Sequence, residues 1–325
     1  MARFEVQNDE IDFARYLLPP EEKSRIVRPS SMNEAINELS TGKAAFEGLR
    51  LPWAKTNHLV RFPPGKVSLW TGKSHHGKTQ LLKQLMLYAV KCDQKVAIAS
   101  MEETPGEVLR DMCSMATLQE RPNPEWVDVF TAWADEKIYI YDQQNLVHPD
   151  RILGVMNYCA RELGVTQFVI DSWMRMDIDG DDFDWHRQFI NILQMHARNA
   201  AVHAHLVVHM TKGDGKEGPQ SFETVRGSGD ILNQVDKIFN VWRNKKPRHQ
   251  RTGGVGGNEP DGLLIVEKQR GRPNWIGPIS IWMDRSSGQF VAEREHMPMG
   301  IIPGINPESA EDQAKTVDIF KGYES

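Results

Sequence analysis

The feature of this chain that most restricts its fold is the segment 72–79, with the sequence Gly-Lys-Ser-His-His-Gly-Lys-Thr. Its spacing is that of the phosphate-binding P-loop, G-x-x-x-x-G-K-[ST]. The two glycines allow the backbone to turn tightly enough for its N–H groups to surround a phosphate. Lys78 is expected to reach the β- and γ-phosphates of ATP, and the Thr79 hydroxyl is expected to ligate Mg²⁺. The residues predicted to bind this nucleotide are Gly72, Ser74, Gly77, Lys78, Thr79 and Gln80.

The residues on either side of the segment favour this interpretation. A short strand-like run occupies residues 66–70, and apolar residues with helical spacing follow over residues 80–90. Strand, glycine loop and helix form the arrangement that phosphate binding needs, because the helix N-terminus directs partial positive charge at the anion. The alternative, a chance Gly/Lys turn, is disfavoured by these flanks.

The rest of the chain predicts an α/β fold. Strand-like segments are expected at residues 67–71, 95–100, 138–141, 167–171, 205–209, 237–242, 262–267 and 279–283. Helical patterns lie at 78–92, 105–116, 149–163 and 183–199. This alternation predicts a mostly parallel sheet flanked by helices, and the last strands, which have no helices between them, predict antiparallel edge strands. We expect an arm or linker over residues 1–60, with a capping box at 31–34, an ATPase domain over 61–296 and a flexible acidic tail over 297–325.

Composition narrows the possible partners and location. The net charge of −5 gives no global attraction to nucleic acid, so a DNA site must be local or must be built by oligomerisation. The three cysteines are scattered without metal-ligand spacing, which is typical of a reducing cytosol. There is no apolar run of about 20 residues and no signal-peptide pattern at the N-terminus. We therefore expect a cytoplasmic protein that does not contact a membrane.

Acidic residues follow two of the predicted strands. Asp171 ends an apolar strand about 90 residues after the P-loop, as in a Walker B motif, and is expected beside Mg²⁺. Glu102 and Glu103 follow the strand at 95–100. A carboxylate at that edge can polarise the attacking water as a general base. The residues themselves leave a second interpretation equally open, in which both acids only stabilise the N-terminus of the next helix.

Several segments together resemble a known family. After the P-loop come Ser100-Met101-Glu102-Glu103, the strand ending at Asp171, Val207-Val208-His209, Arg226-Gly227-Ser228-Gly229 and Glu267-Lys268-Gln269-Arg270. In this order they resemble DnaB-type replicative helicases, which have a RecA-like core, and the helicase domain of phage primase-helicases and Twinkle. The likeness covers about residues 45–293, and the segments after the P-loop make it specific. No primase module or helical collar is recognisable in the first 60 residues, so primase activity is not expected.

The resemblance implies roles for five residues. Glu102 is implied as the catalytic base, Asp171 as the Mg²⁺-linked acid and His209 as the sensor of the γ-phosphate. Arg270 is implied as an arginine finger that reaches the nucleotide of a neighbouring subunit, with Lys268 beside it. An arginine supplied in trans accelerates phosphoryl transfer by roughly 10³–10⁵. Hydrolysis would then require an oligomer, and the family implies a hexameric ring.

Two basic segments are candidate contacts for single-stranded DNA. The glycine-rich loop after His209 carries Lys212 and Lys216, and the resemblance implies that this loop and Arg226 line the channel of the ring. The run 243–251 is more basic, but a solvated loop between two edge strands is an equally good interpretation of it. His203, His205 and His209 share one face of a possible strand, yet no fourth ligand for a metal is evident, so a role of His209 at the nucleotide is preferred.

These observations predict a ring-forming DNA helicase that couples ATP hydrolysis to translocation on single-stranded DNA and to duplex unwinding. A separate primase, loader or polymerase is a possible partner. Two alternatives remain open: a RecA- or RadA-like recombination ATPase that forms filaments, and an ATP-switched loader or regulator that does not unwind DNA.

Overall fold

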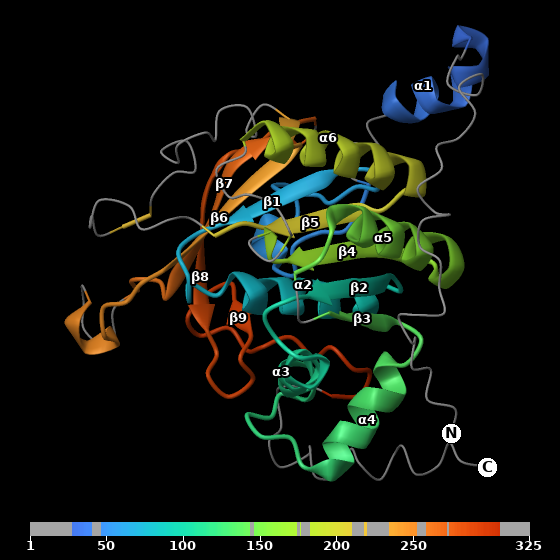
Figure 1. Cartoon of the computed structure of the whole chain (residues 1–325). Coiled ribbons are helices and arrows are strands. Elements are labelled where there is room, and N and C mark those ends of the chain that lie inside the picture. Colours follow the sequence, from blue (N-terminus) through green and yellow to red (C-terminus); the bar gives the residue numbers. More distant parts are fainter. Residues whose placement is uncertain are drawn as a thin grey trace.

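The computed structural model describes residues 28–40, 47–143, 146–173, 176, 183–209, 218–219, 234–251, 258–271 and 273–305. Within these ranges the chain forms one nine-stranded sheet with helices on both faces (Figure 1). The strands are β1 Val67–Thr71, β2 Lys95–Ser100, β3 Ile138–Asp142, β4 Val165–Asp171, β5 His203–Val207, β6 Lys237–Arg243, β7 Gly262–Gln269, β8 Gly277–Met283 and β9 Phe290–Val291. The helices are α1 Asn33–Ser40, α2 Lys78–Lys91, α3 Pro105–Thr117, α4 Pro124–Ala134, α5 Pro149–Leu163 and α6 Phe183–Ala200.

The order of strands across the sheet is β3-β2-β4-β5-β1-β6-β7-β8-β9. The six strands from β3 to β6 are parallel, and β6, β7, β8 and β9 pair antiparallel. The predicted fold class, a mostly parallel sheet flanked by helices with antiparallel edge strands, is therefore confirmed. Ligands bind at the carboxyl ends of parallel strands in such sheets, so this edge is where a site is expected.

Successive residues of the central strands face two separate hydrophobic layers. Trp70 packs with α2, α3 and α4 on one face of the sheet. Leu69, the residue before it, packs with α5 and α6 on the other face. The strands are thus buried on both sides, as expected for parallel strands covered by helices. Residues 49–62 and 301–305 contribute Trp53, Phe62 and Ile301 to the first layer, and the Trp53 indole donates to the carbonyl of Phe290 at 2.8 Å.

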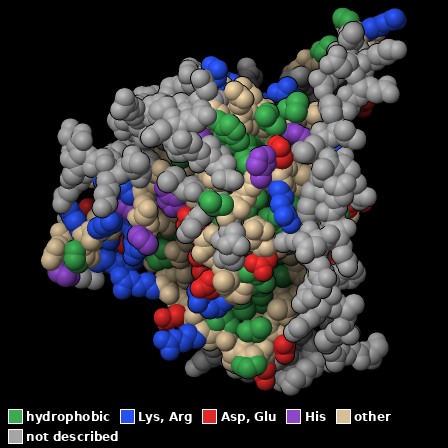
Figure 2. Space-filling view, viewed as in Figure 1, with side chains coloured by type: hydrophobic (Ala, Val, Ile, Leu, Met, Phe, Trp, Pro, Cys, Tyr) green, Lys and Arg blue, Asp and Glu red, His purple; other side chains and the backbone are tan. Residues whose placement is uncertain are grey.

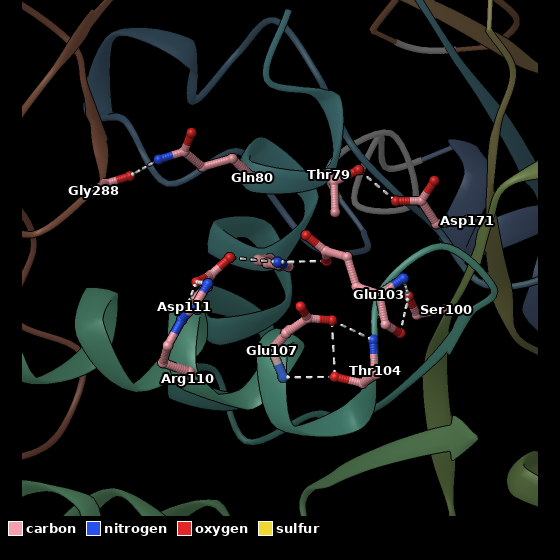
Figure 3. Close-up of polar contacts among 11 residues, drawn as sticks. Thr79, Gln80, Ser100, Glu103, Thr104, Glu107, Arg110, Asp111, Asp171 and Gly288 are labelled. Carbon is pink, nitrogen blue, oxygen red and sulfur yellow. Dashed lines mark hydrogen bonds and ion pairs between the residues drawn. The ribbon is translucent and has the colours of Figure 1, made fainter. Parts of the chain in front are cut away.

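The start of α3 is fixed by its capping residues. The Thr104 hydroxyl accepts from the Glu107 N–H, and the Glu107 carboxylate accepts from the Thr104 N–H, which completes a capping box. Figure 3 shows these contacts at the start of α3, close to Ser100 at the end of β2. The cap fixes where the helix begins, and so it fixes the short connection that carries Glu102 and Glu103.

Some local predictions were wrong. The strand expected at 205–209 is β5 His203–Val207, because His203 and His205 are buried and continue the strand toward its N-terminus. The capping box expected at 31–34 does not form: a short 3₁₀ helix covers Pro29–Met32, and the Ser31 hydroxyl donates to the carbonyl of Arg28. Helix α4 and strand β9 were not predicted. In the part of the chain that is described, no helix is long and apolar enough to cross a bilayer.

Candidate functional site

The P-loop connects the end of β1 to the start of α2 and depends on its two glycines. Gly72 has φ +135°, and a Cβ at this position would lie 2.3 Å from the carbonyl oxygen of Val241 on β6. Gly77 has φ +90° and forms the N-cap of α2. A side chain at either position would strain the backbone. The sequence therefore folds here into a tight loop whose N–H groups precede the positive end of a helix.

Lys78 lies inside this loop. Its side chain is buried, and Nζ donates to the carbonyls of Gly72 at 2.9 Å and Lys73 at 3.1 Å. Burial lowers the pKa of Lys78, whereas the nearby carboxylates of Asp171 and Glu102 act to raise it. The ammonium is thus held beside the loop N–H groups and in the field of both acids, the position that the P-loop interpretation requires.

Thr79 and Asp171 meet across the sheet edge. Asp171 ends β4, and its Oδ2 accepts a hydrogen bond from the Thr79 hydroxyl at 2.5 Å (Figure 3). Burial is the main cause that raises the pKa of Asp171, and the bond from Thr79 opposes it. The second oxygen, Oδ1, is buried and has no hydrogen-bond partner among the described residues. A hydroxyl and a carboxylate with an unbonded oxygen are suitable ligands for Mg²⁺, so these residues fit the predicted ion.

The two glutamates after β2 have different surroundings. Glu102 Oε1 accepts from the Ser172 hydroxyl at 2.8 Å and lies 3.2 Å from Nε2 of His209. Glu103 instead forms an ion pair of 2.7 Å with Lys83. Glu102 therefore belongs to the cluster beside Asp171, as a catalytic base would, whereas Glu103 has a structural partner. The catalytic role of Glu102 stays a prediction.

Lys83, on α2, was not singled out from the sequence. It is buried and also pairs with Asp111 of α3 at 2.8 Å. Figure 3 shows the carboxylates of Glu103, in the connection after β2, and of Asp111, on α3, pointing toward the same nitrogen. The resulting ion-pair cluster ties the loop with Glu102 to the helix that follows the P-loop.

One cavity of about 840 Å³ is lined by Ser74, Lys78, Thr79, Glu102 and His209, and Asp171 lines a second pocket that shares Thr79 with it. The cavity is also lined by residues to which the sequence analysis gave no role at the nucleotide: Asp111, Ser114 and Met115 of α3, Arg243, and Ser287 and Gly288 before β9. Nothing in local sequence spacing brings these segments together. A volume of this size suits a small organic ligand.

Gln80, predicted as a nucleotide-binding residue, uses its side chain differently. Its Nε2 donates to the carbonyl of Gly288 at 2.6 Å, so it joins the first turn of α2 to the turn before β9 (Figure 3). That bond fixes the turn at Gly288, which lines the cavity. The backbone of Gln80 remains in the first turn of the helix that follows the P-loop.

The histidines do not form the three-histidine metal site considered above. His203 Nδ1 donates to the carbonyl of Pro63 at 2.7 Å, and its Nε2 accepts from the Ser68 hydroxyl at 2.7 Å. His205 accepts from the Trp70 indole and donates to Gln167 Oε1 at 3.0 Å. Of the three, only His209, beyond the end of β5, reaches the cavity.

Arg270 and Lys268 lie far from the P-loop of their own chain. Lys268 pairs with Ile238 and Gln269 with Lys237 at the start of β6, and Lys237 in turn pairs with Ser68 near the start of β1. The P-loop begins at the opposite end of β1, about 13 Å further along the strand at about 3.3 Å per residue. Arg270 Nη1 donates to the carbonyl of Gln234 at 3.3 Å. Their catalytic roles stay predictions.

The predicted DNA contacts Lys212, Lys216 and Arg226 lie outside the described residues. The competing basic run is described and lines a cavity of about 360 Å³ that adjoins the P-loop at His75. Two of its arginines, Arg248 and Arg251, form ion pairs with Asp261. Figure 2 shows Lys and Arg side chains gathered on the side where β6 and β7 project in Figure 1. This surface is basic, but part of its charge is neutralised internally.

Of the comparisons with known proteins, only that with solved structures finds matches. No protein-family model matches the chain, and no curated protein matches it. Among solved structures, one described as an ATPase domain matches with a TM-score of 0.66 and 15% identity over 82% of this chain and 98% of that one. A DnaB-like replicative helicase, solved in a study of its interactions with primase, matches with a TM-score of 0.64 and 15% identity over 82% of this chain and 67% of that one. The chain therefore has the RecA-like fold of DnaB-type helicase ATPase domains.

Proposed function

We propose that this chain is a DNA helicase that hydrolyses ATP with Mg²⁺, moves along single-stranded DNA and acts as a ring, most simply a hexamer. The observation that carries the proposal is the meeting of Lys78, Thr79, Asp171 and Glu102 at one edge of a RecA-like sheet. Each of these four side chains has a distinct task in phosphoryl transfer. The fold alone could serve other reactions, so the site supplies the argument.

We propose the following roles for these side chains. Lys78 and the P-loop N–H groups bind and orient the phosphates, and Thr79 with Asp171 would hold Mg²⁺, which neutralises charge on the phosphates when bound. Glu102 accepts the proton of the attacking water. Ser172 orients the carboxylate of Glu102 through its hydrogen bond. His209, 3.2 Å from Glu102, is placed to respond to the terminal phosphate.

The part of the cavity that α3 lines suits the nucleoside. Met115 offers an apolar, polarisable surface for a flat base, and Asp111 and Ser114 on the same helix offer polar partners for a sugar or for the edge of a base. The turn that carries Gly288 is held beside Met115 by the Gln289 side chain, which donates to the Met115 carbonyl at 2.8 Å, and by Gln80. We propose that the base lies against the surface that α3 and this turn form together.

The position of Arg270 supports an oligomer. Arg270 lies at the end of the sheet where the parallel strands begin, whereas the P-loop of the same chain lies where they end. Arg270 is therefore poorly placed to serve the nucleotide of its own chain. A neighbouring subunit in a closed ring would bring one such end against the next P-loop. Single-stranded DNA would pass through the ring beside Lys212, Lys216 and Arg226. We further propose that the protein works in the cytoplasm beside a separate primase, loader or polymerase.

A forked-duplex unwinding assay with ATP and Mg²⁺ tests this function. Wild type should separate the strands, Lys78→Ala should not, and Lys91→Ala, a matched change at the exposed end of the same helix, should behave as wild type. ATP hydrolysis without strand separation would favour a loader or regulator. Open filaments on DNA in electron micrographs, in place of rings, would favour a recombination ATPase.

A further inference from the structure

Three side chains of different types converge at the ends of three neighbouring strands. Glu102 follows β2, Asp171 ends β4 and His209 follows β5, and these strands are adjacent in the sheet. One oxygen or nitrogen atom from each lies within 4.8 Å of those from the other two. Glu102 Oε1 and His209 Nε2 are 3.2 Å apart. Bonds of about 2.0–2.2 Å to a tetrahedral ion place neighbouring ligand atoms at about this separation.

The partners of these side chains orient them toward a common point. The Ser172 hydroxyl donates to Glu102, and the Thr79 hydroxyl donates to Oδ2 of Asp171. Asp171 is only 3% exposed, yet its other oxygen, Oδ1, has no hydrogen-bond partner among the described residues. His209 Nε2 faces Glu102 Oε1 at 3.2 Å, and neither ring nitrogen of His209 has a hydrogen bond in the described part of the chain. Buried polar atoms are normally paired, so Asp171 Oδ1 and the His209 nitrogen that faces the carboxylates indicate a missing ligand.

We propose that Glu102, Asp171 and His209 form a binding site for a divalent transition-metal ion of the Zn²⁺ or Co²⁺ type. Mg²⁺ prefers an all-oxygen site with near-ideal octahedral geometry, whereas an imidazole nitrogen with two carboxylates suits zinc-like ions. The hydrogen bonds from Ser172 and Thr79 are the outer contacts that such ligands normally have. Glu102 and His209 lie in connections beyond the strand ends, so small side-chain rotations bring all three ligands to bonding distance.

The consequence rests on the proposed function. An ion held by Glu102 draws charge from the carboxylate and lowers its basicity toward the proton of water, so it inhibits hydrolysis. It also shares Asp171 with the Mg²⁺ of the nucleotide complex, so Mg²⁺ with ATP and the transition-metal ion compete. The ammonium of Lys78 lies in the field of both carboxylates and weakens their attraction for a dication. The site thus makes the enzyme sensitive to a zinc-like ion.

Calorimetric titration of ZnCl₂ into the full chain, free of nucleotide and Mg²⁺, tests the site directly. We expect one ion per chain in this site. Glu102→Gln and His209→Gln should each weaken binding by about 10-fold or more, and Ser172→Ala, which removes only an outer contact, by about 10-fold. His148→Gln and His296→Gln are matched controls, because each of these exposed histidines lies beside one surface carboxylate, at 3.6 Å and 3.5 Å. Both controls should leave this binding unchanged.

The outcomes separate this inference from the proposed function. Absence of saturable binding, or equal affinity in wild type and in the folded Glu102→Gln and His209→Gln variants, would overturn the site. Visible absorption of bound Co²⁺, lost in the same two variants, is the second measurement. If Zn²⁺ binds here but no ATP hydrolysis occurs under any condition, the site stands and the function is wrong. If hydrolysis proceeds with Mg²⁺ and Zn²⁺ fails to bind, the reverse holds.

Discussion

At the scale of single residues, Lys78 gives the sharpest test of the phosphate site. Replacement by alanine removes the buried ammonium that faces Asp171 and Glu102, and ATP hydrolysis should fall by at least about 100-fold because charge stabilisation of the phosphates is lost. The fold should persist, since Lys78 bonds only to carbonyls of its own loop. Turnover and thermal melting of the same preparation are the measurements. A folded variant with near-normal turnover would contradict the whole interpretation of the site.

How far single residues could be predicted depended on whether their role is local. Lys78 and Thr79 were assigned from spacing alone, because phosphate binding needs consecutive backbone and side-chain groups. Glu102 and Glu103 could not be separated, since only the tertiary partners Ser172 and Lys83 distinguish them. Gln80 was assigned to the nucleotide, but its side chain bonds to Gly288, more than 200 residues away in the sequence. No local pattern encodes such a contact.

At the scale of elements, the cap of α3 positions the connection that carries Glu102. Thr104→Ala removes the hydroxyl that accepts from the Glu107 N–H and should lower the free energy of unfolding by about 1 kcal/mol. Thr131→Ala is a matched control, because Thr131 is exposed and its hydroxyl donates back to the carbonyl of Val127 within α4, away from the start of that helix. Urea unfolding of both variants checks this. An equal effect in the two would show that the capping box contributes no specific stability.

Two loops compete as the DNA-binding element. If the loop with Lys212 and Lys216 contacts the strand, replacing both lysines by alanine should lower the log–log salt slope of single-stranded DNA binding by about 0.7 for each lost contact. DNA-stimulated hydrolysis should fall more than basal hydrolysis. The comparison is Lys245→Ala with Lys246→Ala, a double change in the described basic run. A wild-type slope in the first variant and a reduced slope in the second would place the DNA on the basic run.

Elements with strong local signals were predicted well. β1 and β2 have the predicted bounds, because continuous apolar runs between turn residues are typical of buried strands. The predicted bounds of β5 were two residues too far along the chain, because buried histidines look like polar boundary residues in a sequence. α4 was missed although Asn123, which caps it, precedes a proline, a known start signal. β9 has two residues, too few for a period to be visible.

At the scale of the whole molecule, buried histidines predict how stability depends on pH. Burial lowers the pKa of His76 from 6.5 to about 4 and that of His203 to about 3, and it lowers those of His196 and His205 as well. The unfolded chain therefore binds these protons more readily than the folded chain. The stability that the histidines contribute is fully present above about pH 6.5 and is lost as pH falls below it, at about 1.4 kcal/mol per pH unit for each of the fully buried His203 and His205 and by less for His76 and His196, which solvent screens.

Urea unfolding between about pH 7.5 and about pH 5 measures this slope. Burial acts to raise the pKa of Asp261, but bonds from arginines and from the Met283 N–H outweigh it and lower this pKa from 3.8 to about 2. Asp261 therefore changes the free energy of unfolding only at more acidic pH. The double variant His148→Gln with His296→Gln, which removes two exposed histidines, should keep the wild-type slope. A free energy of unfolding that stays constant across the window would show that the buried histidines do not control acid stability.

Catalysis across an interface is the prediction that belongs to the assembled molecule. Arg270→Ala should bind nucleotide but lose hydrolysis. Arg270 lies where the parallel strands begin, away from its own P-loop where they end, and would act on a neighbouring subunit. Mixing it with Glu102→Gln should restore part of the activity. At equal amounts, about one quarter of the interfaces in a ring would pair an intact base with a neighbour's intact arginine. Arg121→Ala, an exposed arginine distant in sequence, is the control and should hydrolyse ATP normally. If every mixing ratio stays as inactive as the two parents, while subunit exchange is shown independently by fluorescence energy transfer, Arg270 does not act in trans.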